Sequence, residues 1–173
     1  SINRVKCEGC SVCGEVCPVD AIKMEAALTG QLYESKTEFA PMIHARLKAG
    51  AENSGKLVSE VRDKAEEKAE NENRDLVIVD GSPGIGCPVI ASLNGVDMAL
   101  IVTEPSKSGL SDLKRVVEMI EHFDLKAKVV INKFDLNENM ADKIEEFCEG
   151  HDLEVMARIP FSQIFVELLR EGK

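Results

Sequence analysis

Four cysteines crowd into residues 7–17, spaced as C-x2-C-x2-C-x3-C and followed directly by Pro18. A stretch this rich in Cys, Gly and Pro has too few apolar side chains to form a core, so whatever the thiolates hold must organise it. The chain has six cysteines in all. Because four of them are clustered, they indicate metal ligands rather than a disulfide scaffold.

The spacing is the bacterial ferredoxin pattern, which predicts a 4Fe-4S cluster bound by Cys7, Cys10, Cys13 and Cys17. A zinc knuckle is the alternative, but zinc sites usually separate their two cysteine pairs by many more residues. In two-cluster ferredoxins the fourth cysteine of each motif ligates the other cluster. Cys17 therefore serves either the same cluster as the other three or a second one, and the sequence leaves the cluster count open.

The rest of the chain alternates strand-like and helix-like patterns. Short extended stretches at 21–24, 30–37 and 39–47 suggest strands, and an amphipathic helix is expected from an N-cap at Ser54 to Asn73. Apolar runs that suggest strands buried on both faces then alternate with helical segments. The runs are at 76–80, 98–104, 128–133 and 154–160, and the helices at about 87–94, 108–123, 138–149 and 162–171. This order predicts an α/β fold with a doubly wound, mostly parallel sheet.

Composition excludes several classes of function. The chain has 173 residues and a net charge of -10 without a basic patch, so nucleic acid is not an expected partner. It has no apolar run long enough to span a bilayer and no signal peptide, so we expect no membrane insertion and a cytoplasmic location. The length suits one main domain with a small appendage. Because the chain opens on Ser1 beside the cysteine motif, we interpret it as a fragment.

Several segments carry a resemblance to a known family. VDGSPGIGCPV and INKFDLN, together with the cysteine motif, resemble the MinD and Mrp group of P-loop ATPases, in the subfamily with an inserted ferredoxin domain. The resemblance implies a ferredoxin-type segment at 1–29 and, at 30–173, an incomplete P-loop NTPase-like domain without its phosphate loop. The segment GAENSGK fits G-x4-G-K, but Leu57 stands where Ser or Thr should bind Mg²⁺, so it is not that loop.

The resemblance also implies roles for particular residues. Asp80 matches the Walker B aspartate, a catalytic carboxylate near Mg²⁺, and Pro83 and Gly84 belong to the loop that senses the γ-phosphate of ATP. Asn132 matches the residue that contacts the purine ring, and the loop at Phe161 lies over that ring. A helix cap or a turn is the structural alternative for Asp80, as it is for Asn132.

These observations favour an ATP-binding iron-sulfur protein that couples a nucleotide switch to electron transfer or cluster delivery. In the complete protein the family implies ATP hydrolysis, a homodimer, and a client or redox partner; this chain by itself is not expected to hydrolyse ATP. The alternatives are a plain ferredoxin-like electron carrier on a nucleotide-incompetent scaffold, and a cluster that serves only as a structural staple. Cys87 is expected to be a buried thiol at a helix start, with reporting of cluster state as its alternative, and Cys148 a core residue.

Overall fold

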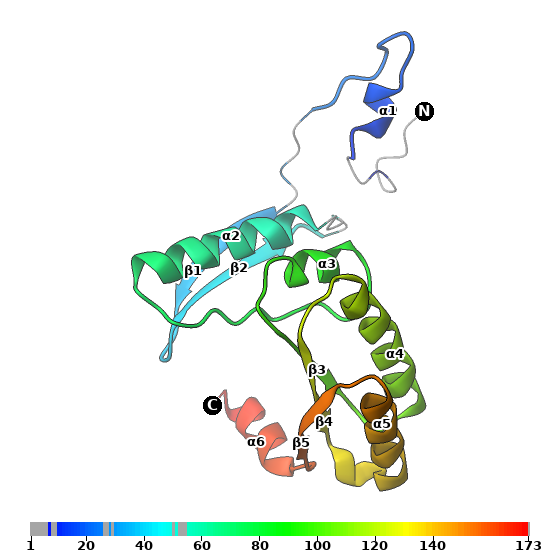
Figure 1. The fold of residues 1–173 in the computed structure, drawn as a ribbon. Coiled ribbons are helices and arrows are strands. Elements are labelled where there is room, and N and C mark those ends of the chain that lie inside the picture. Colours follow the sequence, from blue (N-terminus) through cyan, green and yellow to red (C-terminus); the bar gives the residue numbers. More distant parts are fainter. Residues whose placement is uncertain are drawn as a thin grey trace. The chain divides into compact units, whose positions relative to one another are not determined.

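The computed structural model describes residues 7, 10–25, 28, 30–49, 51 and 55–172. The chain divides into two compact units, residues 1–94 and 95–173, which are coloured blue to green and green to red in Figure 1. The α/β fold class is confirmed, since a parallel sheet with covering helices occupies the second unit. The division at residue 29 into a ferredoxin segment and an ATPase domain stays a prediction.

The first unit contains α1 (Val12–Glu15), a β1 (Gly30–Lys36) and β2 (Pro41–Leu47) hairpin, α2 (Lys56–Asn71) and α3 (Cys87–Leu93). The hairpin strands are antiparallel, with Tyr33 opposite His44 and their rings stacked at 5.4 Å. Thr37 closes the turn: its hydroxyl donates to the Ala40 carbonyl at 2.7 Å and accepts the N–H of Phe39. The strands predicted at 30–37 and 39–47 are confirmed, whereas 21–24 is irregular.

Helix α2 lies along the hairpin and is tied to it by an ion pair (Figure 1). Lys68 Nζ lies 2.6 Å from Glu34 of β1 and 3.0 Å from Glu72. Hydrogen bonds to these two carboxylates raise the pKa of Lys68 above its ordinary value, the bond to Glu34 being the stronger cause. The helix starts at Gly55, which takes the N-cap position at φ 89° without a side-chain cap. The N-cap predicted at Ser54 lies outside the described residues.

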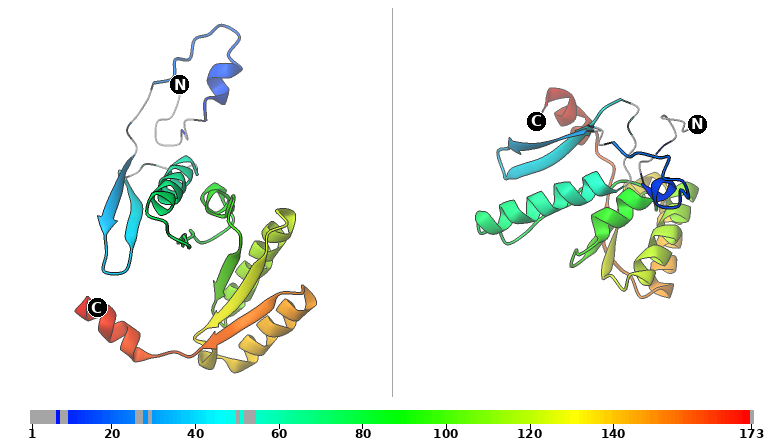
Figure 2. Two further views of the ribbon diagram at one scale, coloured as in Figure 1. Left: turned by 60° about the vertical axis from the view of Figure 1, so that its left-hand side comes forward. Right: turned by 90° about the horizontal axis from the view of Figure 1, so that it is seen from above.

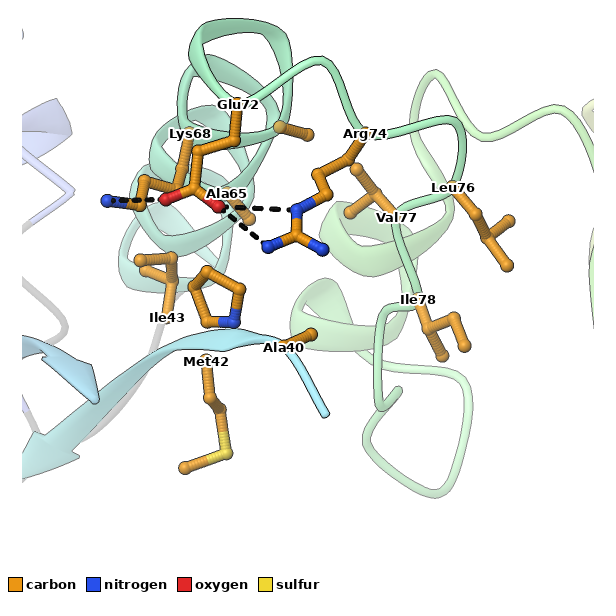
Figure 3. A pocket seen from close by; sticks show the side chains of 12 residues that line it. Ala40, Met42, Ile43, Ala65, Lys68, Glu72, Arg74, Leu76, Val77 and Ile78 are labelled. Atoms are coloured by element: carbon orange, nitrogen blue, oxygen red, sulfur yellow. Dashed lines mark hydrogen bonds and ion pairs between the residues drawn. The ribbon is translucent and has the colours of Figure 1, made fainter. Parts of the chain in front are cut away.

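A cavity of about 250 Å³ opens between the hairpin, α2 and the segment that follows α2 (Figure 3). Apolar side chains supply much of its lining, namely Met42, Ile43, Leu76, Val77 and Ile78. At its rim Glu72 accepts hydrogen bonds from Lys68 and from the Arg74 guanidinium, 3.0 Å away. These bonds, the one from Lys68 first, hold the pKa of the Glu72 carboxyl below its ordinary value. Both cations at the rim are therefore paired with the same carboxylate.

The strand predicted at 76–80 is absent from the described sheets. The segment is irregular, with Leu76 73% and Ile78 85% exposed. A strand needs a neighbour for its backbone N–H and C=O groups, and no strand in the described part of the chain pairs with this one. Apolar content alone is therefore insufficient here, and Asp80 ends an unpaired stretch rather than a sheet strand.

The second unit is a three-stranded parallel sheet in the order β3-β4-β5. Its elements are β3 (Ala99–Thr103), α4 (Lys107–His122), β4 (Ala127–Asn132), the 3-10 turn η1 (Phe134–Leu136), α5 (Glu138–Gly150), β5 (Glu154–Ile159) and α6 (Gln163–Glu171). Helices α4 and α5 both cover the same face of the sheet (Figure 2). These strands and helices confirm the predicted alternation to within a few residues.

One hydrophobic core lies between that sheet face and the two helices. Val129 and Ile131 of β4 are fully buried against Val117 of α4 and Ile144 of α5. The prediction that all the strands are buried on both faces is wrong for β3 and β5. Ile101 and Val155 pack on the core, whereas their neighbours Leu100 and Met156, on the other face of the sheet, are each 52% exposed. Only β4, the central strand, has its inner residues buried on both sides.

Candidate metal centre and switch loop

The cysteine segment is held by local turns rather than by packing. Ser11 adopts a left-handed backbone, φ 66°, and its carbonyl accepts the N–H of Gly14 at 2.8 Å, which starts α1 with Cys13 inside it. Within 10–25 no side chain is buried, and Val16 is 70% exposed. Cys7, Cys10 and Cys13 are exposed. The thiols are thus accessible to metal, and the segment has no core of its own.

Cys17 lies in a turn that directs backbone N–H groups at its sulfur. Asp20 takes a left-handed conformation at φ 48°, and the N–H of Ala21 donates to Cys17 Sγ at 3.3 Å. Hydrogen bonds from the backbone of Val19 and then Ala21 lower the pKa of the Cys17 thiol from its ordinary value. This turn favours the thiolate, which is the form that binds iron.

The four cysteines fit a 4Fe-4S cluster in donor type, number and spacing. Thiolates are the ligands of such clusters, and all four sulfurs lie on one short, accessible segment. Among the described residues, no three His, Cys, Asp or Glu side chains are grouped closely enough to hold a metal ion. This holds for the four motif cysteines as well, which the structure does not gather into such a group. A bound cluster would be held by Cys7, Cys10, Cys13 and Cys17 and would supply one-electron chemistry.

The loop from Asp80 to Gly86 connects the irregular 76–80 stretch to α3. Asp80, Pro83 and Gly84 are all exposed, and Gly84 has φ 98° with open space around its missing Cβ. Pro88 sits in the first turn of α3, where its missing N–H costs no helical bond. The structure thus brings Asp80, Pro83 and Gly84 together in one accessible loop of the first unit.

Asn132 and Phe161 are brought together in the second unit. Asn132 ends β4 and pairs in register with Ile159 of β5, two residues before Phe161. The N–H of Phe161 donates to Asp135 Oδ1 at 2.7 Å, so the loop after β5 is fastened to η1. At the same carboxyl edge of the sheet, Lys133 Nζ lies 2.5 Å from Glu104, which follows β3. Ligands of open α/β sheets bind at this edge.

Sequence reasoning passed over Asp135, although the pattern N-K-x-D contains it at a fixed offset from Asn132. It also passed over Arg62, which interrupts the apolar side of α2 between Val58 and Ala65. The exposed fraction of Arg62 is 7%, and it is the sole buried charged residue among those the structure describes. A charged residue in line with apolar positions of a helix was the available signal.

The two cysteines outside the motif differ in environment. Cys148 is fully buried in the core between α5 and the sheet, and burial raises the pKa of its thiol to about 11. Its predicted core role is confirmed. Cys87 is exposed at the start of α3, so the expectation of a buried thiol there is wrong. Val89 and Ser92 are the buried residues of α3, and Cys87, the first residue of the helix, does not lie on that buried side.

A family model, the 4Fe-4S binding domain, matches residues 1–23. The fold of the chain is similar to two solved structures of cell division proteins. One is the MinC:MinD complex of Aquifex aeolicus, with 26% identity, a TM-score of 0.54, and coverage of 66% of this chain and 49% of that one. The other is the cell division ATPase MinD of Pyrococcus furiosus, with 20% identity, a TM-score of 0.57, and coverage of 80% and 58%. The chain therefore has the fold of MinD-type P-loop ATPases and carries a ferredoxin-type 4Fe-4S segment.

A more similar relative in sequence is the uncharacterized protein MJ0578 of Methanocaldococcus jannaschii. It is 38% identical over 137 residues, which cover 79% of this chain and 48% of that protein. The chain spans about half the length of the curated relatives it matches. In the part of the chain that the structure describes, no helix combines the length and the apolarity needed to cross a bilayer.

Proposed function

We propose that this chain is part of an ATP-binding iron-sulfur protein in which a nucleotide-dependent loop is coupled to electron transfer by, or delivery of, a 4Fe-4S cluster. One observation carries the proposal. The cysteine segment and the exposed loop from Asp80 to Gly86 belong to the same compact unit of a MinD-like chain. The loop therefore lies in the same unit as the cysteine segment, and the hairpin that follows the segment is the connection between them.

Each residue of the loop has a proposed task. Asp80 offers an exposed carboxylate to the coordination shell of Mg²⁺, which prefers oxygen ligands. Pro83 and Gly84 place backbone groups beside the γ-phosphate of ATP, where the left-handed Gly84 admits close approach. In the second unit, Asn132 contacts the purine ring, and the segment fastened by Asp135 sets Phe161 over it.

Coupling requires that ATP bind two arrangements of the loop with different affinity. The nucleotide with Mg²⁺ holds the loop in one arrangement, and hydrolysis releases it. The cysteine segment then changes its exposure or its contact with a partner. In the complete protein we further propose ATP hydrolysis, a homodimer, and a client or redox partner that accepts the electron or the cluster.

A plain ferredoxin-like electron carrier is the second candidate. The observation that favours it is the hairpin before α2: its strands are antiparallel, so α2 does not follow the parallel strand that precedes the helix of a phosphate-binding βα unit. On this reading the scaffold supports the cluster and leaves nucleotide unbound.

The test is anaerobic reconstitution with iron and sulfide, followed by iron analysis and by EPR of the reduced protein with and without Mg-ATP. A 4Fe-4S signal whose midpoint potential shifts with Mg-ATP supports the coupled protein, provided that Asp80→Asn abolishes the shift and Asp75→Asn does not. Asp75 is also an exposed aspartate, five residues earlier, which makes it a matched control. A cluster that is indifferent to nucleotide in this chain, and also in a version extended to the length of its relatives, favours the plain carrier.

A further inference from the structure

Arg62 connects α2 to the C-terminal end of α3. Its Nη1 donates to the Ala91 carbonyl at 3.0 Å and also to the carbonyl of Asn94. Its Nη2 donates to Glu66 Oε1 at 2.7 Å, one turn along α2. The last carbonyls of a helix have no partner inside the helix, and they carry the negative end of its dipole. One guanidinium therefore caps α3 from a different helix.

This arrangement is poorly explained by stability alone. The Arg62 side chain is only 9% exposed, and within the described part of the chain its Nε has no hydrogen-bond partner. A buried charge with an unused donor is a costly way to fill space, and apolar residues of similar size often stabilise a protein as well or better. What arginine adds is geometry, since Nη1 reaches both carbonyls of α3 while Nη2 of the same planar group is held by Glu66 of α2.

A second contact joins the same two helices at the start of α2. A Cβ built on Gly55 would lie 3.0 Å from the Cys87 carbonyl oxygen and 3.4 Å from Ala91 Cβ. The backbone of Gly55 thus touches the first turn of α3, while Arg62 holds its last turn. Contacts at both of its ends therefore hold α3 beside α2 (Figure 1).

The loop after Asp80 is connected to α3 as well. A Cβ built on Gly81 would lie 3.4 Å from Ser92 Oγ. Ser92 is 5% exposed and donates its hydroxyl hydrogen to the Val89 carbonyl at 2.7 Å, so its side chain is held in one orientation. The loop therefore touches α3 next to Asp80 and continues directly into it at Gly86.

We propose that Arg62 is a positioning residue that locks α3, and with it the loop from Asp80 to Gly86, onto α2. This inference rests on the proposed function for the meaning of the loop as a switch. Helix α2 is in turn ion-paired to the hairpin through Lys68 and Glu34. A displacement of the loop is thereby passed to α2 and to the hairpin that follows the cysteine segment, instead of being absorbed locally.

The test compares Arg62→Lys with the native chain, both reconstituted with the cluster, by hydrogen-deuterium exchange without nucleotide. Lysine keeps the charge but has a single nitrogen, so it cannot bond the carbonyls of α3 and the Glu66 carboxylate in the same planar arrangement. We expect about tenfold faster exchange at residues 81–94 and unchanged exchange in α2, the hairpin and α4. Arg115→Lys is the matched control, because Arg115 is an exposed helix residue that pairs with Asp112 at i,i+3; we expect it to leave residues 81–94 unchanged.

Unchanged exchange at 81–94 in Arg62→Lys overturns the proposal, and so does an equal acceleration across the whole first unit, because that is general destabilisation. If Arg62→Lys does not fold, Arg62→Met keeps the bulk without the charge, and its exchange at residues 81–94 is compared with that of the native chain in the same way.

A second experiment adds Mg-ATP. Exchange in the native chain should then change in both the loop and α2, whereas exchange in the variant should change in the loop alone. If neither the native chain nor a version extended to the length of its relatives responds, the proposed function is contradicted, while the nucleotide-free comparison still decides the role of Arg62.

Discussion

Gly55 and Gly84 offer a paired test of the contact between α2 and α3. Both adopt left-handed backbones, with φ of 89° and 98°. Alanine at either site has the same conformational penalty of about 1–2 kcal/mol. At Gly84 nothing lies within 4 Å of the new Cβ, whereas at Gly55 it meets the Cys87 carbonyl oxygen at 3.0 Å. That contact is tighter than most Cβ contacts, so the Cys87 backbone has to shift slightly away, and we expect this overpacking to cost a further ~1–3 kcal/mol.

We therefore expect Gly84→Ala to lower the free energy of unfolding by about 1–2 kcal/mol, and Gly55→Ala by about 2–5 kcal/mol. With a urea dependence of about 1–3 kcal/mol per molar, the Gly55 variant should unfold at a midpoint roughly 1 M below the Gly84 variant. The chain has a single tyrosine and no tryptophan. Tyr33 lies in β1, so its fluorescence reports unfolding of the first unit alone.

The reasoning is refuted if the two variants have the same midpoint, because the contact with Cys87 would then contribute nothing. It is equally refuted if Gly84→Ala is the more damaging change. Reconstituting every sample with iron and sulfide in the same way keeps any quenching of Tyr33 by the cluster common to all of them.

Three further predictions concern the cysteines and the second core. Cys17→Ser should lower the iron bound per chain after reconstitution and bleach the visible absorption, while Cys87→Ser should leave both unchanged. Burial raises the pKa of Cys148 to about 11, from 9.0 for a free thiol, so the folded state holds that proton more tightly than the unfolded state does. The free energy of unfolding should therefore fall as pH rises from about 9 to 11, and it should fall less steeply with pH in Cys148→Ala. Ile131→Ala should destabilise the second unit by about 2–5 kcal/mol in thermal unfolding followed by circular dichroism, against less than about 0.5 kcal/mol for the exposed Ile164→Ala.

The sequence predicted the second unit well because its strands and helices are defined by local periodicity. The runs at 98–104, 128–133 and 154–160 are each followed or preceded by an amphipathic helix, and the resulting βαβ order leaves one parallel arrangement. The 76–80 run has the same composition, yet it forms no strand. Pairing depends on a neighbour, which no local pattern reveals.

The candidate site was predictable where chemistry alone defines it. The four motif cysteines follow from their spacing, and the 4Fe-4S family model covers them. The tertiary contacts were not predictable: Arg62 reaches carbonyls about thirty residues away in sequence, and Phe161 is held by Asp135 from another element. The exposure of Cys87 likewise depends on which side of α3 faces α2, and residue type gives no signal of that.

The order β3-β4-β5 in the second unit has a consequence for how the chain folds. Each strand pairs with the next strand in sequence, and the helix between them packs on the sheet that they form. Contacts of short sequence separation lower the entropy lost in closing loops, and proteins rich in them fold faster. We expect residues 95–173 to collapse early around Val129 and Ile131, before the first unit acquires its metal. Because synthesis runs from the N-terminus, the cysteine segment emerges before residues 95–173 and has no folded C-terminal unit beside it while that unit is still being made.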